Sequence, residues 1–315
     1  MTDIRSQSRD MVIGFIGLGD MGRPLALRLL RAGFSLVVCD RNPVVVEEFF
    51  AAGAVAVTTP REVASQAPLV ITCLPTPDIC REVAYGEGGL IEGTAIRWHV
   101  ELSTAGYPCM RDLAENLGAK GIEVLDAPVS GGPRGEARGR LICFVAASQD
   151  AFDHARPVLT ALSDKLFHVG HVPGQSQVLK LANNLLGAAN LAIASEMVNM
   201  ARKAGIEPQT AIDVMNVSTG RNRATEEIFE SEILSGNFGL GAKLSILQKD
   251  VSLAIREADR LGVTHTASDG VRSVWEAAVA AGHGSEDLSR IYEFIVRTSI
   301  PPERDKAQEI PAHEN

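Results

Sequence analysis

The chain has 315 residues, of which 45% are hydrophobic and 22% are charged, as in a soluble globular protein long enough for two domains. Its formal net charge is −9 and no run of Lys and Arg stands out, so nucleic acids and anionic membranes are poor candidates as partners. The N-terminus lacks the apolar core of a secretion signal, and the five cysteines show neither disulfide nor metal-ligand spacing. We therefore expect a cytoplasmic protein without a metal site.

The first half of the chain alternates short apolar runs with helical periods. Strands are expected at Val12–Ile16, Ser35–Cys39, Ala54–Val57, Leu69–Leu74, Trp98–Leu102, Ile122–Leu125 and Leu141–Ala146. Because these runs are continuously apolar and are separated by helices, they predict an α/β fold. Its core would be a doubly wound, mostly parallel Rossmann-type sheet covered on both faces.

The strand signal stops after Gly174. Helices are expected at Gln175–Gly205, Pro208–Val217, Ala224–Leu234 and Leu244–Gly262, with a further pair after Ser268. This change predicts a first domain over residues 11–172 and an all-α second domain over residues 173–300. Residues 1–10 and 301–315 are polar, and we expect both segments to be disordered.

A glycine-rich turn, G-x-G-x-x-G, follows the first strand. Gly17 permits the tight turn, Gly19 lets a pyrophosphate approach the backbone, and Gly22 lets the next helix pack on the strand. The N–H groups and the dipole at the start of that helix face the phosphates. We therefore expect this segment to bind a dinucleotide through Gly17, Leu18, Gly19, Asp20, Met21 and Gly22.

An acidic residue ends the second strand. Asp40 lies about twenty residues beyond the turn, where a carboxylate accepts hydrogen bonds from the adenosine ribose hydroxyls. A carboxylate also repels the 2′-phosphate of NADP, whereas the adjacent Arg41 could bind that phosphate or lie over the adenine. The sequence therefore favours NAD and leaves NADP open.

A second glycine-containing turn, D-A-P-V-S-G-G, begins at Asp126 after a predicted strand. Ser130 supplies a hydroxyl, and Gly131 and Gly132 expose backbone N–H groups without a side chain in the way. Together these groups can hold a carboxylate. Taken alone, the same residues also describe an ordinary turn.

The helix that opens the second half is apolar except for a few polar side chains. Lys180 and Asn184 are four residues apart, with Asn183 between them, so all three are predicted to share one face, continued by Gly187 and Asn190. The other faces carry Val, Leu, Ala and Ile and are too apolar for a water-facing exterior. We therefore expect the polar face to line a cleft, where burial would lower the pKa of Lys180 and let it exchange a proton near neutrality.

With these motifs in place, the chain resembles the β-hydroxyacid dehydrogenase family, which includes 3-hydroxyisobutyrate dehydrogenase and tartronate semialdehyde reductase. The resemblance extends over nearly all of Met11–Arg297. It rests on seven motifs in order: G-F-I-G-L-G-D-M-G, D-R-N-P, L-P-T-P, E-L-S-T, D-A-P-V-S-G-G, G-Q-S-Q-V-L-K-L-A-N-N and L-Q-K-D-V-S-L-A. It implies hydride transfer between NAD(P) and a small hydroxy acid or its semialdehyde, in a homodimer or homotetramer.

The resemblance also implies residue roles. Lys180 would be the catalytic acid/base. The substrate, a small carboxylate, would be held by Ser130, Gly131, Gly132 and Asn184. The dinucleotide would also be contacted by the backbone of Leu74 and by Thr104 and Lys249.

The chain departs from the family pattern near the predicted site. Ser176 stands where the family usually has a Gly, Ala146 and Ala147 replace a Gly pair, and Arg140 takes a usual Thr position. Pro133 and Arg134 follow the S-G-G turn and leave the identity of the hydroxy acid open. None of these departures removes a proposed catalytic group.

Two other functions are compatible with the same scaffold. One is a non-catalytic dinucleotide-binding module that senses cofactor or mediates assembly, although such a protein could lose Lys180 and Asn184 freely. The other is an imine reductase, a group that tends to lack this Lys. A further open point is Arg221, in the segment S-T-G-R-N-R-A-T-E, which could pair with a second acidic group on the substrate or simply be solvated.

Overall fold

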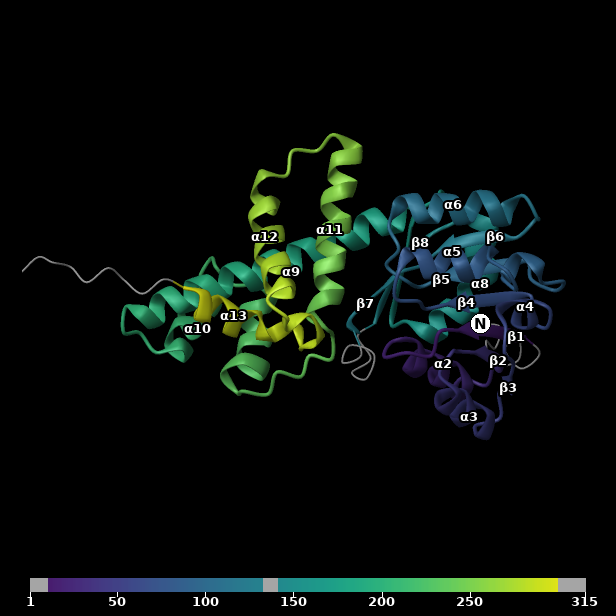
Figure 1. Ribbon diagram of the computed structural model, residues 1–315, viewed down its shortest axis with the longest axis horizontal. Helices are drawn as coiled ribbons and strands as arrows, with labels where there is room; N and C mark the ends of the chain where they lie inside the picture. Colours follow the sequence, from purple (N-terminus) through teal and green to yellow (C-terminus); the bar gives the residue numbers. More distant parts are fainter. Residues whose placement is uncertain (1–10, 133–140, 300–315) are drawn as a thin grey trace, which may run out of the picture.

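The computed structural model describes residues 11–132 and 141–299. The predictions of disorder at residues 1–10 and 301–315, and the departures at Pro133, Arg134 and Arg140, lie outside the described residues. A sheet domain (elements β1 to β9) and a helical domain (α9 to α13) lie end to end, joined by the long helix α9, Gln175–Lys203 (Figure 1).

The sheet domain has nine strands within the described residues. They are β1 (Val12–Ile16), β2 (Ser35–Cys39), β3 (Val55–Ala56), β4 (Leu69–Thr72), β5 (Trp98–Glu101), β6 (Glu123–Asp126), β7 (Val129–Ser130), β8 (Ile142–Ala146) and β9 (Lys165–Gly170). Their order is β3-β2-β1-β4-β5-β6-β8-β7, with β9 also paired to β8. Only the β6–β8 and β7–β8 pairs are antiparallel among the described strands, so the predicted doubly wound, mostly parallel fold class is confirmed.

Strands β7 and β9 were not predicted from the sequence. β7 has two residues, too few to show a period. β9 carries Lys165 and His168, and exposed residues alternate with half-buried ones along its first half, so it lacks the continuous apolar run of the interior strands.

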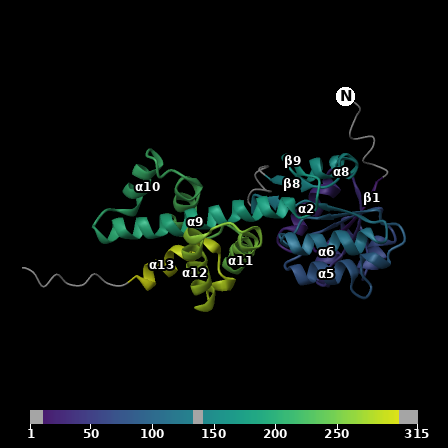
Figure 2. The same ribbon diagram turned by 90° about the horizontal axis from the view of Figure 1, so that it is seen from above.

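Helices cover both faces of the sheet. They are α2 (Gly22–Arg31), α3 (Pro43–Ala51), α4 (Pro60–Ala64), α5 (Pro77–Tyr85), η1 (Leu90–Glu92), α6 (Tyr107–Gly118) and α8 (Gln149–Leu162). One core lies under α2, α3 and α8, and a second lies under α4, α5 and α6. Figure 2 shows α2 and α8 on one side of the sheet and α5 and α6 on the other. Successive strand residues such as Phe15 and Ile16 point into different cores, which explains why the strands are apolar throughout.

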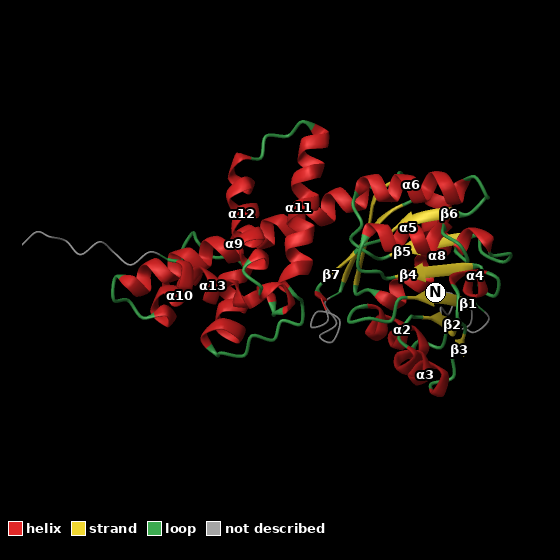
Figure 3. Cartoon of the chain, viewed as in Figure 1, coloured by secondary structure: helices red, strands yellow, loops and turns green. Residues whose placement is uncertain are grey.

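The helical domain packs around the buried side chains of Phe229 and Trp275. Its remaining elements are α10 (Pro208–Asn216), the π-helix η2 (Ala224–Leu234), α11 (Leu244–Leu261), α12 (Thr266–Ala280), η3 (His283–Ser285), η4 (Leu288–Arg290) and α13 (Ile291–Thr298). The four helices predicted with bounds begin at the observed residues, although Ala224–Leu234 is wound as a π-helix. Of the pair expected after Ser268, α12 begins slightly earlier, at Thr266. Figure 3 shows that the described strands are confined to the other domain.

One premise about α9 was wrong. The apolar residues opposite the polar face were expected to be buried, yet Leu179, Leu186 and Ile193 are 44%, 64% and 53% exposed. They recur every seven residues and form a stripe along α9. The burial of Lys180 therefore comes from other neighbours and not from these residues.

Within the described part of the chain, no helix combines the length and the apolar character that crossing a lipid bilayer requires.

Candidate active site

The glycine-rich turn between β1 and α2 has the geometry that its three glycines predict. Gly17 has φ +91°, and a Cβ there would lie 2.3 Å from the Cys73 carbonyl oxygen. A Cβ on Gly22 would lie 1.8 Å from the Gly17 carbonyl oxygen, so α2 can approach the strand only without a side chain there. A Cβ on Gly19 would meet nothing within 4 Å. The backbone at Gly19 therefore faces open space, which a pyrophosphate fits.

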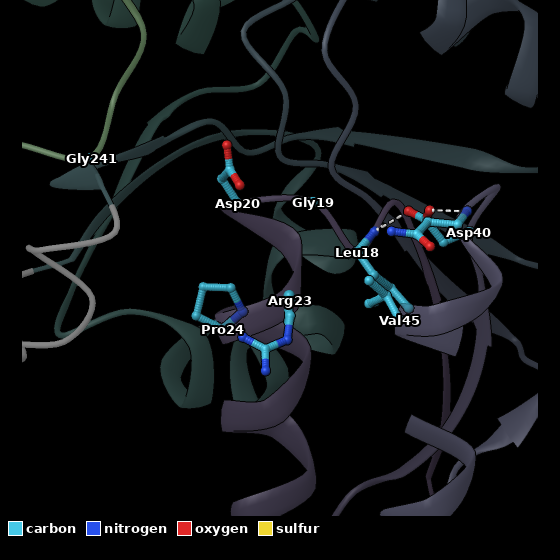
Figure 4. Close-up of a pocket in the computed structure, with 9 residues that line it drawn as sticks. Leu18, Gly19, Asp20, Arg23, Pro24, Asp40, Val45 and Gly241 are labelled. Atoms are coloured by element: carbon cyan, nitrogen blue, oxygen red, sulfur yellow. Dashed lines mark hydrogen bonds between the residues drawn. The ribbon is translucent and has the colours of Figure 1, made fainter. Parts of the chain in front are cut away.

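A cavity of about 500 Å³ opens at this turn. It is lined by Leu18, Gly19, Asp20, Arg23, Pro24, Asp40, Asn42, Val45 and Gly241. Figure 4 shows Asp20 and Asp40 on opposite sides of Gly19, with Gly241 beyond Asp20. Because Gly241 lies on the loop that leads into α11, both domains line the cavity.

Asp40 holds the turn through its carboxylate. One oxygen accepts from the Leu18 N–H at 2.6 Å and the other from the Asn42 N–H at 2.7 Å (Figure 4). Arg41 is exposed, and Met21 precedes the first residue of α2. The predicted dinucleotide residues of the first two strands thus meet at one edge of the sheet, around this cavity.

The loop after β5 connects the two domains near the same edge. The Leu74 N–H donates to the Ser103 hydroxyl at 2.6 Å. Lys249, on α11, donates from Nζ to the Thr104 carbonyl oxygen at 2.7 Å, and it forms an ion pair with Asp250 at 3.1 Å. The structure therefore brings together Leu74, Thr104 and Lys249, three residues that only the family resemblance had grouped.

Lys180 lies at the start of α9 and is 7% exposed. Burial lowers the pKa of Lys180 to about 8; the nearby Asp250 carboxylate opposes this shift, and the positive charges of Lys249 and Arg223 add to it. Asn184, one turn further on, donates from Nδ2 to Asp250 at 2.7 Å. Lys180 is thus held among fixed charges and is able to be neutral in part near pH 8.

The polar face of α9 is divided. Lys180 is buried and Asn184 is half-buried, whereas Asn183 and Gly187 are exposed. Asn183 makes its hydrogen bond to Asn184, at 3.3 Å. The prediction that all three polar residues line one cleft was therefore wrong for Asn183, because a helix turn of 3.6 residues places positions 183 and 184 on different sides of the face.

The D-A-P-V-S-G-G turn lies between the sheet and the helical domain, where β7 is drawn in Figures 1 and 3. Ser130 pairs with Ile142 of β8. Gly131 and Gly132 have φ of 137° and 64°, conformations that disfavour a side chain. Asp126, at the start of this turn, accepts from the Gly174 N–H at 2.8 Å, so the turn is tied to the first residues of α9.

Sequence reasoning gave no role to four residues that the structure places in the site: Ser103, Asp126, Gln177 and Asp250. Asp126 and Gln177 stand inside quoted motifs, but their partners lie 48 to 74 positions away along the chain. The position of Gln177, three residues before Lys180 and therefore on the same side of the helix, was the one usable signal in the sequence. Ser176, the departure before Lys180, is buried, and its hydroxyl has no partner among the described residues.

The sheet order, the glycine turn and the cavity define a dinucleotide-binding protein with a helical second domain. Family models agree. Residues 12–170 match the NAD binding domain of 6-phosphogluconate dehydrogenase, and residues 174–295 match the NAD-binding domain of NADP-dependent 3-hydroxyisobutyrate dehydrogenase.

Relatives of known activity extend over most of the chain. The 2-(hydroxymethyl)glutarate dehydrogenase of Eubacterium barkeri is 33% identical over 93% of this chain and 98% of its own length. The 3-sulfolactaldehyde reductase of Escherichia coli is 31% identical over 90% and 95%. The solved structure of Mycobacterium tuberculosis 3-hydroxyisobutyrate dehydrogenase with L-serine aligns with a TM-score of 0.83 at 27% identity, over 90% of this chain and 99% of that one.

The chain belongs to the β-hydroxyacid dehydrogenase family. It is an NAD(P)-dependent oxidoreductase that acts on the CH–OH group of a small hydroxy acid. The non-catalytic alternative is thereby set aside. An imine reductase from Pseudomonas sp., 18% identical with a TM-score of 0.59, shares the fold alone.

Proposed function

We propose that Lys180 is the general acid/base of the reaction. The observation that supports this role is the burial of its amine, which lowers the pKa of Lys180 to about 8, beside the dinucleotide edge of the sheet. A neutral Nζ accepts the proton of the substrate hydroxyl in oxidation, and a protonated Nζ returns it in reduction. With the pyrophosphate of the dinucleotide bound at the glycine turn, its nicotinamide would supply the hydride acceptor or donor.

The substrate in this proposal is a short hydroxy acid or its semialdehyde. Its carboxylate meets the hydroxyl of Ser130 and the backbone N–H groups of Gly131 and Gly132, and Asn184 orients it. The bond from Asn184 to Asp250 supports this assignment, because it fixes the amide beside Lys180. The relatives act on 2-(hydroxymethyl)glutarate, 3-hydroxyisobutyrate and 3-sulfolactaldehyde, which define a first panel of test compounds.

NAD is the proposed cofactor. Asp40 lines the cavity, and Glu48 lies nearby, paired with the cavity residue Arg23 at 2.6 Å. The carboxylate of Asp40 suits ribose hydroxyls and opposes a 2′-phosphate. The ion pair with Glu48 also engages Arg23, a cation that would otherwise be available to bind that phosphate.

A second copy of this chain is the proposed partner. The stripe of Leu179, Leu186, Ile193 and Met200 on α9 is 44% to 64% exposed and repeats at seven-residue intervals. A stripe of this period suits packing against another helix, and burying it in a homodimer or homotetramer would remove an apolar surface from water.

The acid/base proposal is tested by Lys180→Met. We expect turnover to fall by ~10²–10⁴-fold, the contribution typical of a positioned acid or base, while the dissociation constant for NAD stays near that of the wild type. Substrate-dependent NADH absorbance gives the turnover, and fluorescence titration gives the NAD affinity. Lys165→Met, at an exposed lysine of β9, is the matched control. Wild-type turnover in the Lys180 variant would remove this residue from the mechanism.

A further inference from the structure

Two fully buried polar side chains join three segments at the edge of the sheet. Gln177 and Asp126 are each 0% exposed. The Gln177 amide nitrogen donates to an Asp126 carboxylate oxygen at 2.6 Å and to the Ser103 carbonyl oxygen at 3.1 Å. The Gln177 amide oxygen accepts from the N–H groups of Ala105 and Gly106 at 2.9 and 3.0 Å.

Every hydrogen-bonding position of the Gln177 amide is therefore used. An amide has two donor hydrogens and one acceptor oxygen with two lone pairs, and all of them have partners. No apolar side chain of similar volume could replace them without leaving buried N–H and C=O groups unpaired, which destabilises a protein. Such a network fixes one arrangement of the segments that it joins.

Asp126 completes the network from the sheet. Its second carboxylate oxygen accepts from the backbone N–H groups of Gly174 and Gln177 at 2.8 and 3.2 Å. Gly174 precedes α9 in a left-handed conformation and brings no side chain to cap the helix. The carboxylate of β6 thus caps the helix that carries Lys180. Burial raises the pKa of Asp126 to about 7, and the hydrogen bonds from Gln177 and Gly174 oppose that rise.

The other end of the network is the loop after β5. Gln177 binds this loop on both sides of Thr104, whose own carbonyl oxygen accepts from Lys249. The same loop also contacts Leu74 through the Ser103 hydroxyl. One side chain, a single turn before Lys180, therefore connects the acid/base helix to the residues assigned to the cofactor side.

We propose that Gln177 and Asp126 are positioning residues that set where the amine of Lys180 stands relative to the nicotinamide side of the cleft. This inference rests on the proposed role of Lys180. It predicts that breaking the network slows proton and hydride transfer while the dinucleotide still binds at the glycine turn. The hydrogen bonds described for the two side chains lead to other segments and not to that turn. Misplacement of a reacting group by about 1 Å can cost about 100-fold in rate.

The first test compares Gln177→Leu with Gln175→Leu. Both glutamines are in the first turn of α9, but Gln175 is exposed and accepts only from the Val172 N–H among the described residues. We expect kcat to fall by about 10- to 100-fold in the Gln177 variant and to change little in the control. The primary deuterium isotope effect on the transferred C–H bond should rise, because chemistry becomes slower than product release.

The second test exchanges the two groups and guards against simple unfolding. In Gln177→Glu two carboxylates face each other, so the rate of reduction, which uses protonated Lys180, should recover relative to the wild type at the same pH as the pH falls and one carboxylate takes up a proton. In Asp126→Asn two amides face each other and the helix cap is impaired. In the double variant D126N/Q177E the new amide again donates to the new carboxylate, but the Ser103 carbonyl oxygen still lacks its donor. We therefore expect kcat to exceed that of either single variant and to stay below that of the wild type.

The outcomes separate this inference from the proposed function. Wild-type turnover in Lys180→Met overturns the acid/base role and the inference with it. A slow Lys180→Met together with an unchanged kcat in folded Gln177→Leu overturns only the positioning role. A double variant no faster than the single variants, with melting temperatures equal to theirs, also overturns it. Recovery in the double variant, with NAD affinity unchanged throughout, supports it.

Discussion

The glycine turn lies at the same edge of the sheet as the group of side chains around Lys180, which we call the Lys180 wall. The two are built in different ways. The turn acts through backbone atoms, and its critical residues stand within six consecutive positions from Gly17 to Gly22. The wall acts through side chains from α9, α11 and the ends of β5 and β6, joined by bonds that link positions up to 145 apart. A short sequence motif is enough to predict the first kind of site, whereas the second can be identified only once the fold is known.

The largest effect should come from removing the space on which the turn depends. Gly22→Ala places a Cβ 1.8 Å from the Gly17 carbonyl oxygen, so the turn must move. We expect an overpacking cost of about 1–3 kcal/mol, a lower melting temperature and loss of dinucleotide binding. Gly19→Ala meets no atom within 4 Å and should melt near the wild-type temperature, yet it should bind NAD more weakly because the Cβ stands where the pyrophosphate approaches. Calorimetry measures the melting temperatures and fluorescence titration measures the NAD affinities. Equal melting temperatures in the two variants would contradict the different roles given to Gly22 and Gly19.

An intermediate effect is expected at Asp40, which belongs to the same readable region. Asp40→Ala removes hydrogen bonds to a charged group, worth about 1.5–3 kcal/mol each, so NAD affinity should fall by about 10-fold or more. The use of NADP relative to NAD should increase. The ratio of kcat/KM values for the two cofactors measures this preference, with Glu47→Ala, at an exposed carboxylate outside the cavity lining, as the control. An unchanged ratio in the Asp40 variant would place the ribose elsewhere.

The smallest effect tests the wall through its charges. Oxidation requires neutral Lys180, so its rate should rise with pH through about 8, and the rate of reduction should fall over the same range. Arg223→Gln removes a positive charge that lowers the pKa of Lys180, so the inflection should move to higher pH. Asp250→Asn removes the carboxylate that raises this pKa, so the inflection should move to lower pH. Arg221→Gln is the control and should leave the inflection in place. An inflection that also stays in place in both the Arg223 and the Asp250 variants would contradict the assignment of the titrating group.

The sequence predicted the fold closely because each interior strand carries a continuous apolar run and each long helix carries a helical period. It predicted the wall only in part. The helix period placed Lys180 and Asn184 on one face but did not show that Asn183 turns outward or that Leu186 is exposed. The hydrogen-bond partners of Gln177 depend on the packing of segments far apart in sequence, which no local pattern contains. The same packing decides that the charge of Arg223, and not that of Arg221, lowers the pKa of Lys180.

The single helix that joins the domains also has a mechanical consequence. α9 has 29 residues, about 44 Å at 1.5 Å per residue, and it starts beside Gly174. If the helical domain rotates about Gly174, the displacement of each residue of α9 grows with its distance from that glycine. A rotation that moves the far end by ~10 Å moves Lys180, about 9 Å from Gly174, by ~2 Å. Because a shift of about 1 Å can already cost about 100-fold in rate, the same rotation that opens the cleft to small molecules would also take the amine out of its working position.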